Sequence, residues 1–401
     1  MLKKIGTVEL KPGMFVVDTG ISWLENPYLY AHEGLVGSES DVRRIRDEGY
    51  LEVFIDTRRS LFGRDPDGVS DEEILSGALQ QLEDPGVLEP QVPVAEEMRK
   101  ATVLYDTTVR YARGIMDEMR DKGVVDMSEA EPLVDSMLGS ITRNTNALVG
   151  LAKLRNVDEY TYTHCINVGL LSMVFGRHLG FGPVTLARLG LAGLFHDLGK
   201  ARIPDDILKS PRRLSPDEFE VMKGHPGIGF EYMRERGGVP EEVLEGVYEH
   251  HEKHNGLGYP RGLRGEQISV AGRILAVVDV YDALTSRRVY KEPMLPHKAL
   301  SLMYGMRGQD FSPGLVERFI RCLGIYPVGS VVELNTGQRC VVSEANLRNP
   351  LQPRVLIVHD SKGRPCSPRP LDLAGQTAVR IATCLDPVGV GIDPGRALGA
   401  M

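Results

Sequence analysis

The chain has 401 residues, which is long enough for two or three domains with a sizeable hydrophobic core. Its formal net charge of −8 argues against general DNA or RNA binding, because such binding needs a basic surface. The five cysteines form no CxxC pair, which argues against a disulfide framework and against a cysteine zinc site. No uninterrupted apolar run approaches the length of a membrane span, and the first residues lack the apolar core of a signal peptide. We therefore predict a reduced, cytoplasmic protein with no DNA partner and no membrane span.

The first part of the chain, residues 1–80, is predicted to form a small β-rich domain. Its segments "GMFVVDTG" and "YLEVFID" are rich in β-branched and aromatic residues and are bounded by Gly or Asp. An acidic, proline-rich stretch at about 64–96 is typical of a linker. Residues 97–155 then show helical periodicity with Gly123 as a helix stop, so residues 81–129 are predicted to be a linker and a connecting helix. The apolar faces of these helices suit either pairing in a homodimer or packing on the core of one chain.

The centre of the chain, residues 130–327, is predicted to be an all-helical domain. Its sharpest helix start is "LSPDEFEVMKGH", where Ser215 is the N-cap, Pro216 takes the first helical position and Glu218 completes a capping box. After "LGIYPVGS" the pattern changes to short strands such as "VVEL" and "RVLIVHD", so residues 328–401 are predicted to form a small β-rich region. The predicted fold is therefore mainly α, with a helical domain between two small β-rich parts.

Seven histidines and aspartates of the centre lie in settings that suit metal ligands. They occur in "YTYTHCINVG", "AGLFHDLGK", "MKGHPGIG", "YEHHEKHNGLGYP" and "RILAVVDVYDAL", and they are His164, His196, Asp197, His225, His250, His251 and Asp279. Imidazole and carboxylate ligands favour Fe, Mn, Zn or Ni over Mg or Ca. Seven ligands exceed the needs of one ion, so the set predicts two ions that share a bridging carboxylate. Such paired metal ions are a recurrent solution for phosphoester hydrolysis.

Two of these sites are embedded in apolar helices, where a polar side chain needs a partner. Asp279 interrupts "ILAVVDVYDAL" and requires either a metal or a base such as Arg273 beside it. His196 and Asp197 end the apolar run "LARLGLAGLF", and Gly199 is placed to stop that helix. The alternative for His196 is a histidine in an ordinary core hydrogen bond.

The remaining histidines lie next to helix breakers. His225 precedes Pro226 and is therefore expected to end a helix. His250 and His251 are adjacent, so on a regular helix their side chains would diverge by about 100°, and they suit one metal only at a helix end. As isolated residues they are equally compatible with exposed or helix-terminal histidines. It is the joint pattern that predicts a metal site.

Cations near these ligands fit a phosphate-containing substrate. Lys200 lies three residues after Asp197, so on one helical face it would reach the same site. Arg287, Arg288 and Lys291 follow the apolar stretch "VVDVYDALT". Arginine offers bidentate contacts to phosphate, and lysine offers a point charge. The alternative for both groups is a solvated helix end.

Taken in chain order, "FHDLGK", "HP", "EHHEKHNGLGYPRGL" and "VDVYDALTSRRVYK" resemble the HD-GYP domain, a bacterial subclass of the HD superfamily of metal-dependent phosphohydrolases. The resemblance covers about residues 130–327, and the combination of these motifs in register is highly specific. The front of the chain is similar to a small domain of poorly known role that often precedes HD-GYP domains. The resemblance implies an all-helical HD-type fold and hydrolysis of the second messenger cyclic di-GMP to linear pGpG and further to GMP. It also implies a role in bacterial signalling that bears on biofilms and motility.

The resemblance further implies roles for individual residues. One metal would be held by His164, His196, Asp197 and Asp279, and the other by the bridging Asp197 together with His225, His250 and His251. The nucleophile would be a metal-bridging hydroxide, and Asp197 and Lys200 would be the catalytic residues, with Lys200 at the scissile phosphate. The residues implied to contact the dinucleotide are Tyr259, Asp282, Arg287, Arg288 and Lys291.

Members of the family with three metals carry a glutamate at the position that Tyr160 occupies here, so two ions are expected. Fe or Mn is expected ahead of Zn or Ni. One alternative is a cyclic di-GMP receptor with little turnover, which would signal through its N-terminal or C-terminal domain. Another is an HD phosphohydrolase that acts on a different nucleotide. Signalling protein partners would bind at the GYP region or the N-terminal domain.

Overall fold

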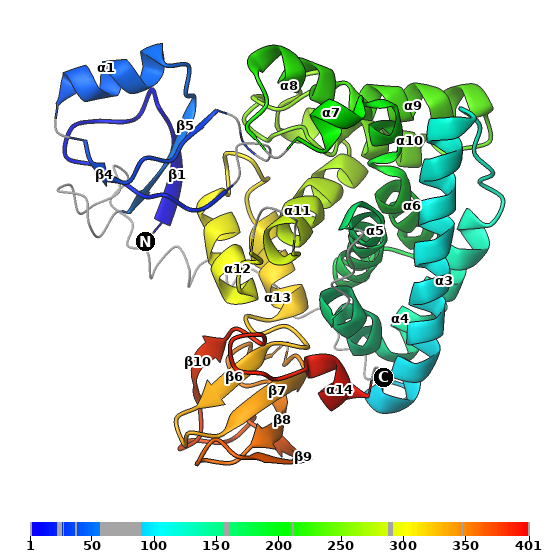
Figure 1. Ribbon diagram of the computed structural model, residues 1–401, viewed down its shortest axis with the longest axis vertical. Coiled ribbons are helices and arrows are strands. Elements are labelled where there is room, and N and C mark those ends of the chain that lie inside the picture. Colours follow the sequence, from blue (N-terminus) through cyan, green and yellow to red (C-terminus); the bar gives the residue numbers. More distant parts are fainter. Residues whose placement is uncertain are drawn as a thin grey trace.

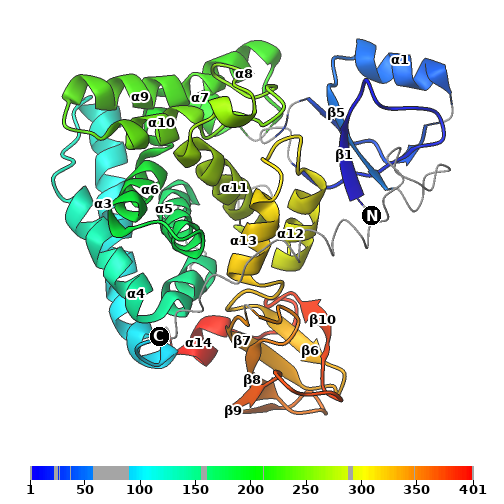
Figure 2. The same cartoon turned by 180° about the vertical axis from the view of Figure 1, so that it is seen from behind.

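The chain folds into three parts that follow one another in sequence. The computed structural model describes residues 2–21, 26, 28–36, 38–56, 90–154, 160–210, 212–287, 292–346 and 348–399, so most of the predicted linker at 64–96 lies outside the described residues. Figure 1 shows a β-rich domain at the N-terminal end, a large helical centre and a β-rich domain at the C-terminal end. In the view from behind, both β-rich domains lie on the right-hand side of the helical centre, the N-terminal domain above and the C-terminal domain below (Figure 2). The fold is mainly α, as predicted.

In its described residues, the N-terminal domain is a five-stranded sheet with one helix. Its elements are β1 (Leu2–Gly6), β2 (Phe15–Val16), β3 (Leu29–Tyr30), β4 (Gly34–Leu35), α1 (Glu39–Asp47) and β5 (Glu52–Asp56). Strand β5 is central, because it pairs antiparallel with β1 and β2 and parallel with β3. Ile5 and Val53 from the sheet and Val42 and Ile45 from α1 form a small hydrophobic core. Strands β2 and β5 lie in the two segments that the sequence predicts to be strands.

Two long helices form one side of the helical centre. They are α3 (Val94–Asp121) and α4 (Ala130–Leu154), which lie side by side in both ribbon views. Gly123 follows α3 at a φ of 67°, a left-handed conformation that favours glycine, so the predicted helix stop is confirmed. The buried face of α3, which includes Met98, Tyr105 and Met116, packs against the core of the same chain. Of the two alternatives for this face, packing on the core is the one that the structure shows.

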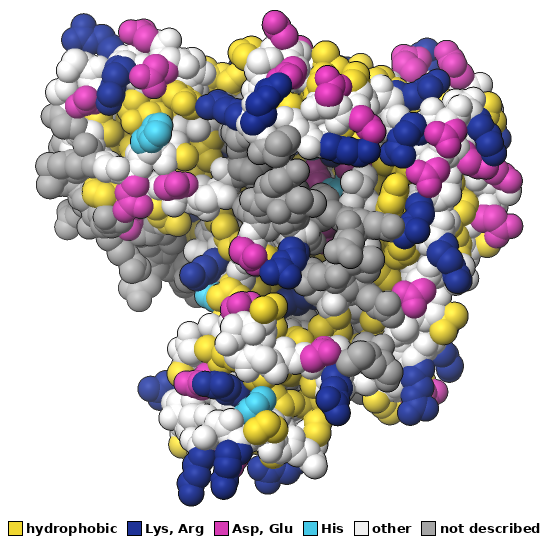
Figure 3. All heavy atoms as spheres, viewed as in Figure 1, with side chains coloured by type: hydrophobic (Ala, Val, Ile, Leu, Met, Phe, Trp, Pro, Cys, Tyr) yellow, Lys and Arg dark blue, Asp and Glu magenta, His cyan; other side chains and the backbone are white. Residues whose placement is uncertain are grey.

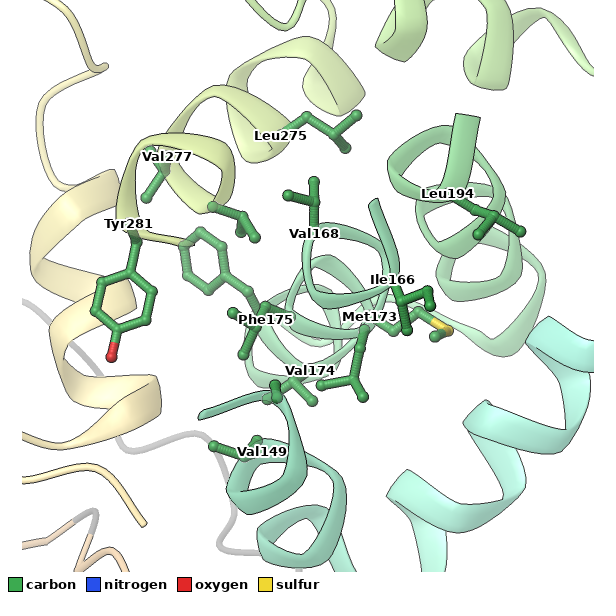
Figure 4. Packing of buried hydrophobic residues seen from close by; sticks show 14 of the residues in the cluster. Val149, Ile166, Val168, Met173, Val174, Phe175, Leu194, Leu275, Val277 and Tyr281 are labelled. Atoms are coloured by element: carbon green, nitrogen blue, oxygen red, sulfur yellow. The ribbon is translucent and has the colours of Figure 1, made fainter. Parts of the chain in front are cut away.

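Three further helices pack around a hydrophobic core, and each one carries or directly precedes predicted ligands. They are α5 (Tyr160–His178), α6 (Pro183–Phe195) and α11 (Val270–Thr285). Figure 4 shows Val168 and Phe175 of α5 close to Val277 and Tyr281 of α11. Each fully buried apolar side chain of this kind contributes roughly 1.5–3 kcal/mol to the free energy of unfolding. This packing fixes the helices that present His164 and the other ligands.

Helices α5 and α6 approach each other most closely at two glycines. A Cβ atom added to Gly193 of α6 would lie 2.5 Å from the Cα atom of Gly169 on α5. The close approach brings the His164 ring on α5 and the His196 ring just after α6 to a centroid distance of 5.1 Å. The two glycines therefore set the spacing of two predicted ligands.

We expect Gly193→Ala to destabilise the protein by about 1–3 kcal/mol, because an added methyl group would force the two helices apart. Thermal unfolding of the metal-free protein measures this loss. Gly114→Ala is the matched control, since Gly114 lies on the exposed side of α3 and an added Cβ would meet nothing within 4 Å. Alanine there is expected to raise stability by up to about 1 kcal/mol. Equal unfolding midpoints for the two variants would contradict the close packing.

The other helices of the centre complete the ligand side and the far end of the domain. They are α7 (Asp205–Leu208), α8 (Pro216–Lys223), α9 (His225–Arg236), α10 (Glu241–Glu249), α12 (Pro296–Gly305) and α13 (Leu315–Leu323). The capping box of α8 is confirmed: the Ser215 hydroxyl accepts from the Glu218 N–H, and the Glu218 carboxylate accepts from the Ser215 N–H.

Two predicted helix boundaries are wrong, and both lie in the ligand region. His225 does not end a helix but begins α9, because Pro226 takes an early helical position where its missing N–H has no intrahelical partner to lose. Helix α6 ends at Phe195, before the predicted stop, and Gly199 lies instead in a 3-10 turn, Leu198–Arg202. A Cβ atom on Gly199 would collide with the carbonyl oxygen of His225. The glycine is therefore needed for the close approach of this turn to α9.

The C-terminal domain is an antiparallel sheet of five strands. They are β6 (Val331–Leu334), β7 (Arg339–Glu344), β8 (Arg354–His359), β9 (Pro365–Asp372) and β10 (Ile381–Leu385), in the order β10-β6-β7-β8-β9. Helix α14 (Pro394–Leu398) then returns to the helical centre, where Leu398 lies beside Gly150 of α4. Acidic and basic side chains are interspersed over the visible face of the N-terminal domain and the helical centre, whereas basic side chains predominate along the lower edge of the C-terminal domain (Figure 3). Within the described ranges, we find no helix with the length and apolar character needed to cross a membrane.

Candidate metal centre

All seven predicted metal ligands come together in two adjacent groups inside the helical centre. The first group is Asp197, His225, His250 and His251, and the second is His164, His196 and Asp279. Within each group the ligand atoms lie within 4.8 Å of one another. The residues come from α5, the turn after α6, the start of α9, the end of α10 and α11, so five separate segments converge. Only His251 is more than slightly exposed, at a quarter of its side-chain surface.

Asp197 lies between the two groups and presents one carboxylate oxygen to each. Its Oδ1 atom is 3.2 Å from Nε2 of His225 and 3.9 Å from Nε2 of His250. Its Oδ2 atom is 3.4 Å from Nε2 of His196 and 3.9 Å from Nε2 of His164. This is the arrangement that a carboxylate shared by two cations requires.

The histidines are oriented by hydrogen bonds at the nitrogen that faces away from the centre. The Nδ1 atoms of His196, His225 and His250 lie 2.7–2.8 Å from backbone carbonyl oxygens, to which only a protonated nitrogen can donate. A neutral ring with its proton on Nδ1 has a lone pair on Nε2. The Nε2 atoms of His225 and His250 are only 3.2 Å apart, so two lone pairs face each other. A cation bound to both nitrogens resolves that repulsion.

Buried polar atoms without partners mark the same place. Across the described part of the chain, Nε2 of His196 and Oδ1 of Asp197 are among the few buried side-chain atoms that make no hydrogen bond. Leaving such atoms buried and unpaired costs free energy. Both atoms belong to residues of the two ligand groups, and both are donor atoms that divalent transition metals prefer. The residues present therefore fit the metal ions that the sequence predicts.

The electrostatics favour the metal-binding protonation states of the first group, Asp197, His225, His250 and His251. Burial lowers the pKa of His225, His250 and His251, and neighbouring histidines lower that of His250 and His251 further. Burial alone would raise the pKa of Asp197, but His196 and Lys200 beside it hold that pKa well below its usual range. Neutral imidazole and ionised carboxylate are the forms that bind metal.

His164 is held between two carboxylates. Burial lowers its pKa, but hydrogen bonds with Asp279 and Asp282 outweigh this and raise the pKa to about 9. Its Nε2 atom lies 3.0 Å from Asp279 and its Nδ1 atom 2.7 Å from Asp282. Asp282 also accepts a hydrogen bond from the Asn167 amide at 2.9 Å, and only 3% of its surface is exposed. Asp282 is therefore placed to orient the predicted ligand His164, and its predicted contact with the dinucleotide stays a prediction.

We expect Asp282→Ala to weaken metal binding by about 10–100-fold, because residues that orient a histidine ligand affect affinity on this scale. Titration of a divalent metal into metal-free protein measures the affinity. Asp135→Ala, at an exposed position on α4, is the control and should bind like the wild type. A variant that keeps its metal affinity and loses only substrate affinity would return Asp282 to the role of a substrate contact.

The remaining predicted site residues lie around the ligands. Lys200 donates to Oδ2 of Asp197 at 2.7 Å, with its side chain 23% exposed. The Tyr259 ring packs on the His251 ring at a centroid distance of 4.8 Å, and burial followed by the charge of Asp279 raises the pKa of the Tyr259 phenol well above its usual value. The phenol therefore stays protonated and can donate a hydrogen bond.

The predicted cations after α11 are only partly described. Arg287 lies two residues after the end of α11 and pairs with Glu292 at 3.2 Å. Arg288 and Lys291 lie outside the described residues, so their predicted contact with the dinucleotide stays a prediction. The side chain of Tyr160, whose backbone begins α5, also lies outside the described part of the chain, so the expectation of two ions stays a prediction.

Sequence reasoning missed two glutamates that shape the site. Glu249 accepts from the N–H of Ser269 at 2.7 Å and pairs with Arg261. Glu252 accepts from the N–H groups of Arg261 and Leu263 at 2.7 and 2.9 Å. Both are 2% exposed and flank the two adjacent histidines. In the sequence, glutamates within a charged, glycine-rich stretch resemble solvent-exposed side chains. Only the fold reveals that these two are buried.

Comparison with known proteins identifies the chain. Three family models match in turn: a domain of unknown function, DUF3391, at residues 2–130, an HD domain at residues 138–315, and a KOW domain associated with HD domain at residues 331–390. A curated cyclic di-GMP phosphodiesterase of Pseudomonas aeruginosa is 35% identical over 380 residues, which cover 94% of this chain and 91% of that protein. The chain belongs to the HD-GYP family of cyclic di-GMP phosphodiesterases.

Other relatives match a smaller share of this HD-GYP protein. A cyclic di-GMP phosphodiesterase response regulator of Xanthomonas campestris is 41% identical over 178 residues, 43% of this chain and 47% of that protein. A 3'3'-cGAMP-specific phosphodiesterase of Vibrio cholerae is 39% identical over 127 residues, 31% of this chain and 24% of that protein. Relatives with similar identities thus carry names that specify different cyclic dinucleotides.

Proposed function

We propose that this HD-GYP protein hydrolyses cyclic di-GMP to linear pGpG and further to GMP, with two divalent metal ions, Fe or Mn ahead of Zn or Ni. The observation that carries the proposal is the carboxylate of Asp197, which turns one oxygen toward each group of ligands. A shared carboxylate between two histidine-rich groups suits a pair of metals, and paired metals suit phosphodiester cleavage. The position of Tyr160, where a glutamate would serve a third metal, supports two ions.

Each ligand group would hold one of the two metal ions. Asp197, His225, His250 and His251 would hold one ion, and His164, His196 and Asp279, again with Asp197, would hold the other. When bound, the two ions would supply Lewis acidity at the phosphoryl oxygens and a water activated near neutral pH.

The chain's own residues then bind and orient the substrate. Lys200, beside Asp197, is placed to donate to an oxygen of the scissile phosphate, where negative charge grows in the transition state. The protonated Tyr259 phenol would meet the dinucleotide next to His251. Arg287, Arg288 and Lys291 would hold the second phosphate and fix the pose.

The proposed setting follows from this substrate. Cyclic di-GMP is a bacterial second messenger. We therefore place the reaction in the cytoplasm, as part of signalling that controls biofilms and motility. We further propose a homodimer, or a protein partner at the GYP region or the N-terminal domain.

A product assay tests the proposed function against its main alternative. Protein purified with its metals is incubated with excess cyclic di-GMP, and the nucleotides are separated by chromatography. We expect many molecules of pGpG and GMP per chain. Stoichiometric binding without product would favour a receptor with little turnover. Faster hydrolysis of 3'3'-cGAMP than of cyclic di-GMP in the same assay would assign the protein to a different cyclic dinucleotide.

A further inference from the structure

A buried network of four charged side chains joins the N-terminal domain to the helical centre. Its members are Lys4 on β1, Glu52 on β5, Lys253 after α10 and Asp310 between α12 and α13. The Lys4 ammonium lies 2.7 Å from Glu52 and 2.5 and 2.6 Å from the two Asp310 oxygens. Lys253 lies 3.0 Å from Glu52 and 3.7 Å from Asp310. The side chains of Lys4, Glu52 and Asp310 are 0, 2 and 6% exposed, so this network is shielded from water.

The network is balanced in charge, and its ion pairs run both within each domain and between the two domains. Two cations face two carboxylates, with one of each contributed by either domain. Buried charges are costly unless they are paired, so neither domain would bury its own lysine and carboxylate equally well alone. The Asn26 side-chain amide donates a further hydrogen bond to the Glu52 carboxylate at 2.6 Å.

Lys253 belongs to the segment that follows the metal ligands, residues 252–264, which we call the GYP loop. Lys253 is only two positions after His251. On its outer side, the loop donates backbone hydrogen bonds from His254 to the Asp310 carbonyl at 3.0 Å and from Asn255 to the Gln309 carbonyl at 2.8 Å. The outer side is therefore tied to the same segment that holds the ionic network.

On its inner side, the GYP loop is folded back onto the metal centre. The Glu252 carboxylate, next to Lys253, accepts the N–H groups of Arg261 and Leu263 at 2.7 and 2.9 Å. The Tyr259 N–H donates to the His251 carbonyl at 3.2 Å. The loop is thus a single hydrogen-bonded unit, and a shift at Lys253 must move Glu252 and, through it, the residues around Tyr259.

Attachment of the two domains does not by itself require these charges. Phe54 and Leu29 of the N-terminal domain are buried in the main hydrophobic core, and the Leu2 carbonyl oxygen approaches Gly305 of α12 too closely for a side chain there. Apolar contacts of this kind hold domains together at less cost than buried ion pairs. What the ionic network adds is a contact with the GYP loop.

We propose that Lys253 is a positioning residue for substrate binding, and that Glu52 and Lys4 of the N-terminal domain hold it in place. The N-terminal domain thereby completes the GYP loop and sets the position of Tyr259. A ligand or protein that displaces this domain would change substrate affinity without touching the metals. The inference rests on the proposed function, in which Tyr259 contacts the dinucleotide.

The kinetic test uses Lys253→Met and Glu52→Gln in the full-length, metal-loaded protein. We expect each variant to raise KM for cyclic di-GMP by about tenfold, with kcat and the metal content changed by less than about twofold, because binding geometry is lost and chemistry is kept. Lys253→Arg, which keeps the charge, should recover most of the loss. Phe54→Leu is the control, since it weakens the apolar part of the same interface, and it should lower the unfolding midpoint with little change in KM.

A second measurement does not depend on turnover. Hydrogen exchange should become at least about tenfold faster at the amides of Tyr259, Arg261 and Leu263 in both Lys253→Met and Glu52→Gln, because local opening becomes easier. Unchanged exchange in these variants would overturn the inference, as would Phe54→Leu raising KM as much as Lys253→Met does. Absence of hydrolysis by the wild type would instead count against the proposed function, and exchange would still decide the role of Lys253.

Discussion

Asp197→Ala is expected to abolish hydrolysis and to lower the metal content from about two ions per chain to less than one. Asp197 is the residue that both ligand groups share, with its two oxygens 3.2 and 3.4 Å from His225 and His196. Removal of one transition-state-stabilising group typically costs about 10²–10³ in kcat, and this residue serves both metals, so we expect a loss of about 10³-fold or more. Elemental analysis and a nucleotide assay on one preparation measure both effects.

Two comparisons make this expectation specific. Asp205→Ala removes an exposed carboxylate on the neighbouring α7 that pairs with Lys209, and it should leave metal content and turnover unchanged. Circular dichroism should show that Asp197→Ala keeps its helices, because the hydrophobic core does not include this residue. An active Asp197→Ala protein that still binds two ions would disprove the assignment of a shared carboxylate.

The second large effect is expected for Lys200→Met, which should lower kcat by about 10²–10³-fold while the metal content stays at the wild-type level. The Lys200 ammonium lies beside the shared carboxylate and is partly exposed, so it is placed to meet a phosphate oxygen and is not a ligand itself. Methionine preserves the length of the side chain and removes the charge. Rates at saturating cyclic di-GMP separate this effect from weaker binding.

Lys209→Met provides the control for the loss of a lysine in the same region. Its side chain is 66% exposed and pairs with Asp205 outside the ligand groups, so we expect wild-type kinetics. Lys200→Arg keeps a positive charge and should retain part of the activity. If Lys200→Met instead lost its metals with its activity, the lysine would act by holding Asp197 in place.

The ligand set is predictable from sequence because each ligand lies in a local pattern that is unusual for its surroundings. Asp279 within an apolar helix and the adjacent His250 and His251 before a glycine-rich turn are examples. The suggested pairing of Asp279 with Arg273 is replaced by contacts to His164 and His251. The seven residues together therefore predict a metal site more strongly than any one of them does alone.

What the sequence does not reveal is set by contacts between distant parts of the chain. The hydrogen bond of Asp282 to His164 spans 118 residues, and the pair of Lys4 with Asp310 spans 306. Neither pairing has a local signature, because each residue alone resembles an ordinary charged residue of a helix or strand. The start of α9 at His225 was missed for a related reason: a proline marks a helix boundary without saying on which side the helix lies.

The most direct test of the whole account is the number of metal ions per chain in gently purified wild-type protein, with hydrolysis of cyclic di-GMP assayed on the same sample. The account predicts two ions per chain and pGpG and GMP as products, with activity that is lost on chelation and restored by Fe or Mn. Full hydrolysis by a metal-free sample, or a metal-free native protein that neither Fe nor Mn activates, would contradict it.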